Sequence, residues 1–163
     1  STDRIKTVKR TEINMRLLIQ RVNHASVKVD GEVIGNIGKG FLVLVGIGQN
    51  DTREVADKYM KKMLGLRIFE DENEKLNLSL MDIKGEILSI SQFTLYANCK
   101  KGRRPSFLDA AKPEISKPLY EYFNQALENA GVHTETGIFG AMMKVSLIND
   151  GPTTIILDSK EII

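Results

Sequence analysis

Apolar residues recur at alternate positions along most of this chain, and in only two segments do they recur at every third and fourth position. Alternation is typical of half-buried strands, whereas the wider spacing forms one face of a helix. The chain is therefore predicted to be an α+β protein, a single mostly-β domain with a sheet or barrel-like core and two main amphipathic helices. An Asp30-Gly31 pair predicts one tight hairpin. The expected strands are Arg16–Val22, Ala25–Val29, Glu32–Ile37, Phe41–Ile47, Leu66–Phe69, Glu86–Tyr96, His133–Phe139, Met142–Ile148 and Thr153–Asp158.

Capping residues bound both predicted helices. Asp51 and Glu54 have the spacing of a capping box before the first helix, and Gly65 stands where that helix would end. Ser116 is the expected N-cap of the second helix, and Gly131 follows it. The apolar faces comprise Val55, Ala56, Tyr59, Met60, Met63 and Leu64 in the first helix, and Leu119, Tyr122, Phe123, Ala126, Leu127 and Ala130 in the second.

The length of the chain and its composition fit one folded domain. There are 163 residues, of which 42% are hydrophobic and 27% charged, as is ordinary for a protein with a sizeable core. Residues 1–14 are polar and without periodicity, so we interpret them as a leader or extension, a solvated tail in preference to a weak nucleic-acid arm. The domain is expected to occupy residues 15–163.

Several classes of protein are disfavoured by what the sequence lacks. The longest apolar run, Phe41 to Gly48, is too short to cross a bilayer, and no secretory signal precedes it, so we expect a cytoplasmic protein with no membrane partner. A single cysteine, Cys99, excludes an intrachain disulfide, and only His24 and His133 could serve as imidazole ligands. No metal and no cofactor are expected.

Side-chain nucleophilic catalysis is also disfavoured. A serine nucleophile needs an adjacent base, but neither histidine is near Ser91 in sequence and there is no G-x-S-x-G elbow. Cys99 has no evident base, and we interpret it as incidental. The glycines of Gly35–Gly40 fit no phosphate-binding motif and are interpreted as turn residues.

Two short segments far apart in the chain remain unexplained by packing. SQFTLY, Ser91–Tyr96, ends an apolar strand, and NDGPTT, Asn149–Thr154, lies between two other predicted strands. Taken alone, the first could be a half-buried strand with a polar end, and the second an ordinary Gly-Pro turn. Their occurrence together favours a functional interpretation.

Together these segments resemble the D-aminoacyl-tRNA deacylase family, whose signature is a Ser-Gln-aromatic-Thr strand plus an Asn-x-Gly-Pro-Val-Thr turn. The resemblance runs from Met15 to about Asp158, and includes MRLLIQRV at the start, GRRPSF at Gly102–Phe107 and VSLINDGP near the end. One departure is Thr153, which stands where the family usually has valine.

The resemblance implies a homodimeric, cofactor-free hydrolase that cleaves the ester of D-aminoacyl-tRNA in chiral proofreading, and also clears glycyl-tRNA mischarged on tRNA-Ala. It places Ser91, Gln92, Phe93 and Thr94 at the active site. We expect the backbone N–H groups of Phe93 and Thr94 to stabilise charge on the carbonyl oxygen, with help from the ribose 2′-hydroxyl of the substrate.

The same resemblance implies a second set of residues that bind the substrate. A cis Gly151-Pro152 segment would reach into the active site of the partner subunit, exclude L-amino acids and be braced by Arg21. Phe139 and Met143 match residues that line the pocket, although on sequence alone both would be core or interface packing.

The expected partner is the 3′ end of an aminoacyl-tRNA. A net charge of +2 is small for a nucleic-acid-binding protein, but Lys100, Lys101, Arg103 and Arg104 cluster just after the predicted catalytic strand. Two alternatives remain open: a non-catalytic nucleic-acid interaction protein on the same fold, and a sibling deacylase of mischarged L-aminoacyl-tRNA.

Overall fold

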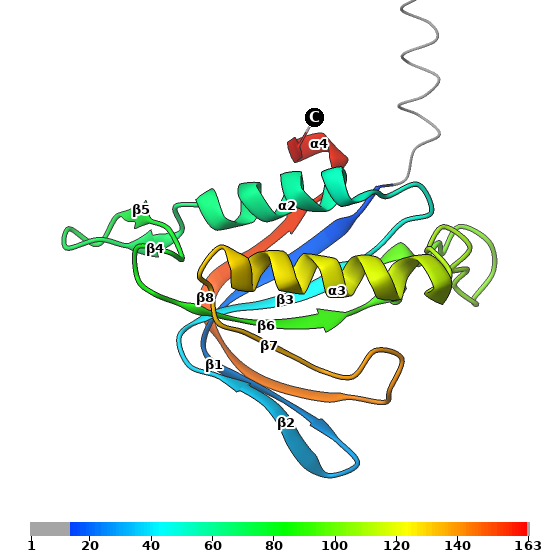
Figure 1. The fold of residues 1–163 in the computed structure, drawn as a ribbon, viewed down its shortest axis with the longest axis horizontal. Helices are drawn as coiled ribbons and strands as arrows, with labels where there is room; N and C mark the ends of the chain where they lie inside the picture. The colour runs from blue at the N-terminus through cyan, green and yellow to red at the C-terminus, as the bar shows by residue number, and fades with distance from the viewer. Residues whose placement is uncertain (1–13, 163) are drawn as a thin grey trace, which may run out of the picture.

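The computed structural model describes residues 14–162, so the predicted leader lies outside the described residues except for Asn14. One mixed six-stranded sheet has the order β2-β1-β3-β6-β7, and β8 pairs with the other edge of β1 (Figure 1). Its strands are β1 (Arg16–Val29), β2 (Glu32–Ile37), β3 (Gly40–Gly46), β6 (Glu86–Ser91), β7 (Thr134–Thr136) and β8 (Lys144–Leu157). The other elements are α2 (Arg53–Gly65), β4 (Phe69–Glu70), β5 (Leu76–Leu78), the 3₁₀ helix η1 (Phe93–Tyr96), α3 (Pro113–Asn129) and α4 (Ser159–Ile162).

β1 is a single strand where two were predicted. Its first half pairs with β3 and its last residues pair with β2, while β8 runs along its other edge through two irregularities near Val22. These irregularities let one strand bend from one neighbour to the next without a break. The Asp30-Gly31 hairpin is confirmed, and both residues have positive φ, 51° and 81°.

β8 is also continuous, although a turn between two strands was predicted over Asn149–Thr154. The register of β8 against β1 shifts at this segment, so it is a bulged stretch within one long strand. The predicted strand Leu66–Phe69 is reduced to Phe69–Glu70, which forms a separate small sheet with β5.

Both predicted helices are present, but both begin elsewhere than expected. The N-cap of α2 is Thr52, whose Oγ1 accepts from Val55 N at 3.3 Å, because the Asp51 carboxylate accepts from the backbone N–H groups of Met15 and Gly48. α3 begins at Pro113, a turn before the predicted cap. No helix within residues 14–162 is long and apolar enough to span a membrane.

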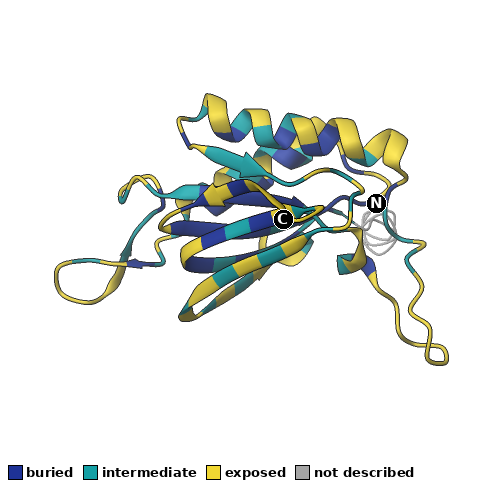
Figure 2. Ribbon diagram, turned by 90° about the horizontal axis from the view of Figure 1, so that it is seen from below, coloured by how far each residue is buried: buried dark blue, intermediate teal, exposed yellow. Residues whose placement is uncertain are grey.

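The sheet has a hydrophobic cluster on each face. α2 and α3 cover one face, where inward residues such as Phe41, Val43 and Ile87 pack against both helices. The outer surfaces of these helices are exposed (Figure 2). On the other face, β2 and the start of β8 curl over β3 and β6, and enclose a smaller cluster around Leu42 and Leu88. The sheet is thus nearly closed and barrel-like.

Candidate functional site

The predicted strand over Glu86–Tyr96 ends at Ser91, and the remaining residues form the 3₁₀ helix η1. Gln92 still donates its backbone N–H to Val45 O at 2.8 Å, and then its φ and ψ of −144° and 82° turn the chain out of the sheet. Leu95 N returns to Gln92 O at 3.3 Å and closes the turn. The Ser-Gln-Phe-Thr motif is therefore a strand end followed by a tight helical turn.

This turn leaves two backbone donors without an acceptor among residues 14–162. The first N–H groups of a 3₁₀ helix have no partner within the helix. No group in residues 14–162 accepts a hydrogen bond from the backbone N–H of Phe93 or Thr94. Both residues are exposed. The chain therefore presents adjacent backbone donors where a substrate can approach.

Side chains of the turn are held by one another. The Gln92 side-chain amide donates to Thr94 Oγ1. The Phe93 ring is 58% exposed and meets the Phe107 ring edge to face, with centroids 5.2 Å apart. Phe107 ends the GRRPSF segment, so the structure brings this segment against the Ser-Gln-Phe-Thr motif.

Two residues that the sequence analysis did not single out, Arg16 and Gly46, contact the last two residues of the turn. Arg16 Nη1 donates to Leu95 O at 2.7 Å, and the Tyr96 hydroxyl donates to Asn14 O at 2.8 Å. A side chain at Gly46 would meet the Tyr96 ring at 2.9 Å, so glycine is needed for this close approach. In the sequence, the only sign of this close approach was that a glycine, Gly46, interrupts the apolar run of β3.

The second motif is braced by the predicted arginine. Arg21 is 5% exposed; its Nε donates to Asp150 O at 3.0 Å and its Nη1 donates to Ile68 O at 2.6 Å. The Asn149 side-chain amide donates to Arg21 O and to Thr153 O, at 3.0 and 3.1 Å. The Gly151–Pro152 peptide bond is cis, and both residues are exposed. The polar contacts thus hold an exposed segment in one position.

Phe139 and Met143 lie in different environments. Phe139 packs against the cluster under the helices, with its ring 6.1 Å from that of Tyr120. Met143 packs against the smaller cluster on the opposite face. Both are half-buried, so packing accounts for their positions within one protomer.

The two motifs are far apart within one protomer. The segment around Gly151 in β8 lies opposite Arg21 of β1. Arg21 is paired with Phe41 of β3, and Phe41 is paired with Ile87 of β6. Ser91 lies at the other end of β6 from Ile87, and β6 is separated from β8 by β1 and β3. At ordinary strand geometry the separation is about 14 Å across the sheet and about 13 Å along it. One protomer therefore does not combine them in a single site.

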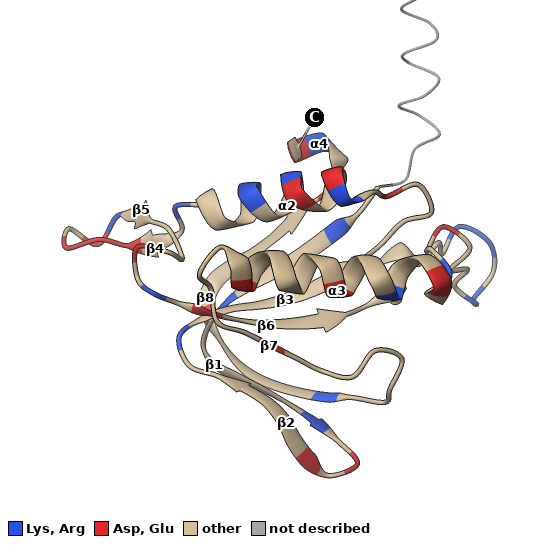
Figure 3. Cartoon of the chain, in the orientation of Figure 1, with Lys and Arg blue, Asp and Glu red and all other residues tan. Residues whose placement is uncertain are grey.

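The basic residues lie on a loop that follows η1 directly. Asn98 and Ser106 exchange backbone hydrogen bonds of 2.8 and 2.9 Å and close this loop. It projects beyond the start of α3, and the blue stretches of its ribbon mark the Lys and Arg positions at that end of the molecule (Figure 3). Its cations, all exposed, are Lys100, Lys101, Arg103 and Arg104.

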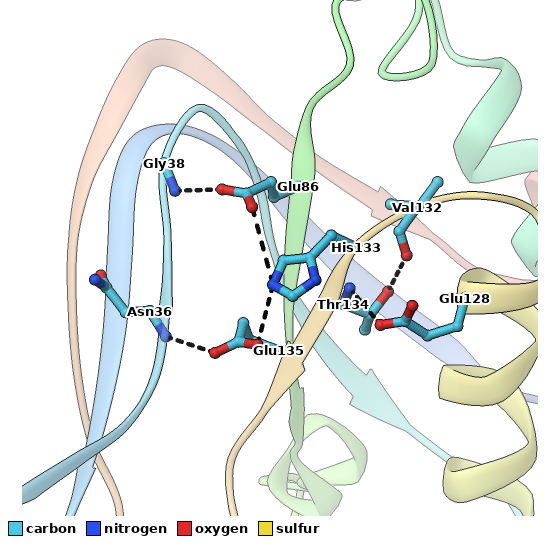
Figure 4. A network of polar contacts seen from close by, with 8 residues as sticks. All are labelled: Asn36, Gly38, Glu86, Glu128, Val132, His133, Thr134 and Glu135. Carbon is cyan, nitrogen blue, oxygen red and sulfur yellow. Dashed lines mark hydrogen bonds and ion pairs between the residues drawn. The ribbon is translucent and has the colours of Figure 1, made fainter.

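Both histidines lie away from the motif. His133 Nε2 is 3.0 Å from the Glu135 carboxylate and 3.9 Å from that of Glu86, which also accepts from Gly38 N at 2.8 Å (Figure 4). This network, and a cavity of about 590 Å³ beside it, lie at the opposite end of β6 from η1. His24 is exposed on β1. Neither imidazole can serve as a base for the Ser-Gln-Phe-Thr turn in this protomer.

Two solved structures share the architecture. One is a c-Myc DNA unwinding element binding protein, 42% identical, with a TM-score of 0.83 over 88% of this chain and 98% of that one. The other, described as a probable eukaryotic D-amino acid tRNA deacylase, is 19% identical with a TM-score of 0.78 over the same shares and supports the fold alone. The nearly closed sheet with two helices on one face defines the α+β fold class that all three share.

The sequence comparisons then give the family. The family model described as D-Tyr-tRNA(Tyr) deacylase matches residues 18–158. A D-aminoacyl-tRNA deacylase from Lactobacillus acidophilus is 63% identical over 88% of this chain and 99% of its own length. One from Thermus aquaticus is 58% identical over 90% and 97%. The chain belongs to the D-aminoacyl-tRNA deacylase family.

Proposed function

We propose that this protein hydrolyses the ester between a D-amino acid and the 3′ end of tRNA, and so acts in chiral proofreading of translation. Water adds to the ester carbonyl, and the ribose oxygen leaves with a proton, which gives free tRNA and free D-amino acid. The names and identities of the relatives support the substrate class. The observation that carries the mechanism is the pair of backbone donors at the exposed residues Phe93 and Thr94, which have no acceptor within residues 14–162 and no imidazole nearby.

In this proposal, the backbone N–H groups of Phe93 and Thr94 bind the carbonyl oxygen as negative charge develops. Fixed donors of this kind are worth about a hundredfold or more in rate, and they need no reorganisation during the reaction. Gln92 holds the Thr94 hydroxyl, which orients the substrate or the water. The ribose 2′-hydroxyl next to the ester assists the attacking water, since the protein offers no base at this point.

Chirality is judged by the Gly151-Pro152 segment of a second copy of the chain. The two motifs are too far apart in one protomer to meet, and the segment is exposed yet braced by Arg21 and Asn149. A two-fold dimer lets each copy lend its segment to the site of the other. The outer face of β1 and β8 supports such a dimer, because it exposes Ile156 beside the half-buried Leu18.

Backbone carbonyls of the segment select by exclusion. They accept hydrogen bonds from the substrate ammonium group and leave no room for an L side chain, whereas a D side chain points away from the protein. The site therefore reads the configuration at Cα and tolerates many D-amino acids. Glycine has no side chain to exclude, so glycyl-tRNA mischarged on tRNA-Ala is a further substrate. Phe139 and Met143 contribute apolar lining near the pocket.

The basic loop contacts the phosphates of the acceptor end. It follows η1 directly, so its cations stand where the 3′ end must pass to reach Phe93 and Thr94. The same loop, and the 42% identity to a protein named for DNA binding, favour nucleic-acid binding without catalysis as the second candidate function.

One assay separates these candidates. The protein is incubated with labelled D-aminoacyl-, L-aminoacyl- and glycyl-tRNA, and release of amino acid is measured. Release from the D and glycyl substrates alone supports the proposal. Release from L-aminoacyl-tRNA identifies the sibling deacylase, and retention of label on all three identifies a binding protein. Repeating the D assay with a terminal 2′-deoxyadenosine tests the ribose hydroxyl, whose loss is expected to slow release strongly.

A further inference from the structure

Tyr120 of α3 reaches the last residues of β6. Its side chain is 4% exposed, and its hydroxyl donates to Ser89 O at 2.6 Å. Its ring also packs near Phe139. The proposed reaction makes no use of this tyrosine. Its hydroxyl nevertheless contacts Ser89, which is two residues before Ser91, the first residue of the Ser-Gln-Phe-Thr motif.

β7 ends before β6 does, which leaves the edge of β6 open. β6 pairs with β7 only as far as Ser89, whereas it pairs with β3 as far as Ser91. Ile87 N donates to His133 O on the β7 side, and Gln92 N donates to Val45 O on the β3 side. Since successive residues of a strand point their backbone groups to opposite sides, those of Ser89 and Ser91 face the edge that β7 has left.

The Tyr120 hydroxyl lies at this gap, since it donates to Ser89 O. In a parallel sheet, one residue of a neighbouring strand donates to the carbonyl of residue i−1 and accepts from the N–H of residue i+1. A tyrosine hydroxyl can do both, because it is a donor and an acceptor. Burial raises the pKa of the Tyr120 hydroxyl, whereas the side chains of Ser89 and Asn124 and then the backbone of Ser91 lower it. The alternation of backbone groups along β6 directs the Ser91 N–H to the same side as Ser89 O, which the Tyr120 hydroxyl contacts.

We infer that Tyr120 is a positioning residue for deacylation: its hydroxyl takes the place of a β7 residue at Ser89 and Ser91 and thereby fixes where the following turn presents its backbone donors. Phe93 N–H is two residues beyond the Ser91 N–H. A small rotation of the strand end moves both donors of the turn relative to the substrate carbonyl, and catalysis by fixed donors tolerates little displacement. The inference rests on the role proposed for the Phe93 and Thr94 N–H groups.

The test compares Tyr120→Phe with Tyr122→Phe. Tyr122 is the matched control, because it lies on the same helix and its hydroxyl donates to the Asp57 carboxylate of α2 at 2.9 Å, away from β6. Loss of the Tyr120 hydroxyl is expected to lower kcat on D-aminoacyl-tRNA about tenfold or more, with KM changed by less than about twofold, because the buried Ser89 carbonyl loses its partner and the strand end that follows it is no longer held. Tyr122→Phe is expected to leave kcat and KM within about twofold of wild type.

Hydrogen exchange gives a readout that is independent of activity and of the proposed function. In the wild-type protein the Ser91 amide is expected to exchange slowly, and in Tyr120→Phe about tenfold or more faster, while Tyr122→Phe leaves it unchanged. A Ser91 amide that exchanges in the wild type like an open surface amide would overturn the inference, as would equal kcat for the two variants. Faster exchange with unchanged kcat would show that Tyr120 holds Ser91 but does not position the turn for catalysis, whereas failure of the Phe93 and Thr94 donor role itself would appear as equal rates for Phe93→Pro and Phe93→Ala.

Discussion

Arg21 and Asp150 are joined twice: Arg21 Nε lies 3.0 Å from the Asp150 carbonyl oxygen and 3.2 Å from its carboxylate. The same guanidinium also donates to Ile68 O, so one buried side chain ties the start of the Gly-Pro segment to β1 and to the loop before β4. Arginine suits this task because its donors are fixed in a planar fork. The position of the segment is therefore set by Arg21.

Arg21→Lys is expected to weaken chiral discrimination. Lysine keeps the charge but cannot reach both carbonyls, so the segment shifts and L-aminoacyl-tRNA gains access. We expect the ratio of D to L hydrolysis to fall about tenfold or more, which corresponds to about 1.4 kcal/mol. The control is Arg67→Lys, since Arg67 donates to Asn77 O on the exposed β4–β5 arm. If Arg21→Lys excludes L-aminoacyl-tRNA as fully as wild type, Arg21 does not set the segment.

Phe93→Pro tests the backbone donor directly. Proline removes the N–H of Phe93 at the first position of η1, where its fixed φ is compatible with a helical turn. Phe93→Ala removes the same ring but keeps the donor. We expect single-turnover deacylation by Phe93→Pro to be about a hundredfold slower than by Phe93→Ala. Equal rates for two folded variants would contradict the role of this N–H group.

Neutralising the basic loop should weaken binding of tRNA without altering chirality. The double variant Lys100→Ala/Lys101→Ala removes two cations next to η1, and its affinity for tRNA should fall less steeply with added salt, by about two in the slope of log affinity against log salt. Lys61→Ala/Lys62→Ala, on the exposed side of α2, removes the same charge elsewhere and should leave the slope unchanged. An unaltered slope in the loop variant would remove the loop from the tRNA-binding surface.

The histidines should be dispensable for turnover. His133 is engaged with Glu86 and Glu135 at the far end of β6, and His24 is exposed on β1. The double variant His24→Gln/His133→Gln is therefore expected to keep kcat within about twofold of wild type, as for surface substitutions. A loss of a hundredfold or so in the folded variant would reveal a general base.

Periodicity predicted most of the architecture, because the sheet buries alternate residues and the helices bury one stripe each. It failed where strand-favouring residues form something else. Phe93 to Tyr96 favour a strand by composition, yet Gln92 turns them into η1, and that turn is what exposes the donors. Asp51 was mistaken for a cap because its contacts with Met15 and Gly48 depend on tertiary structure.

The candidate site was predictable only in part, for a related reason. The Ser-Gln-Phe-Thr and Gly-Pro segments could be recognised as motifs, and the bracing of the latter by Arg21 followed from the resemblance. Tyr120 could not be singled out, because in sequence it belongs to an ordinary amphipathic helix. Its hydroxyl acquires a role only because β7 stops at Thr136, so that Ser89 O accepts from Tyr120 and not from a further residue of β7.

Mixed dimers test the central claim most directly. Arg21→Lys supplies an intact Ser-Gln-Phe-Thr turn with a displaced segment, and Phe93→Pro supplies an intact segment with a defective turn. Excess Phe93→Pro chain is then exchanged into Arg21→Lys dimers. In each mixed dimer, the working turn of the Arg21→Lys chain faces the intact Gly-Pro segment of the Phe93→Pro chain. The account predicts that L-aminoacyl-tRNA hydrolysis by the mixture disappears while D-aminoacyl-tRNA hydrolysis persists. L hydrolysis that persists undiminished after complete exchange would contradict it.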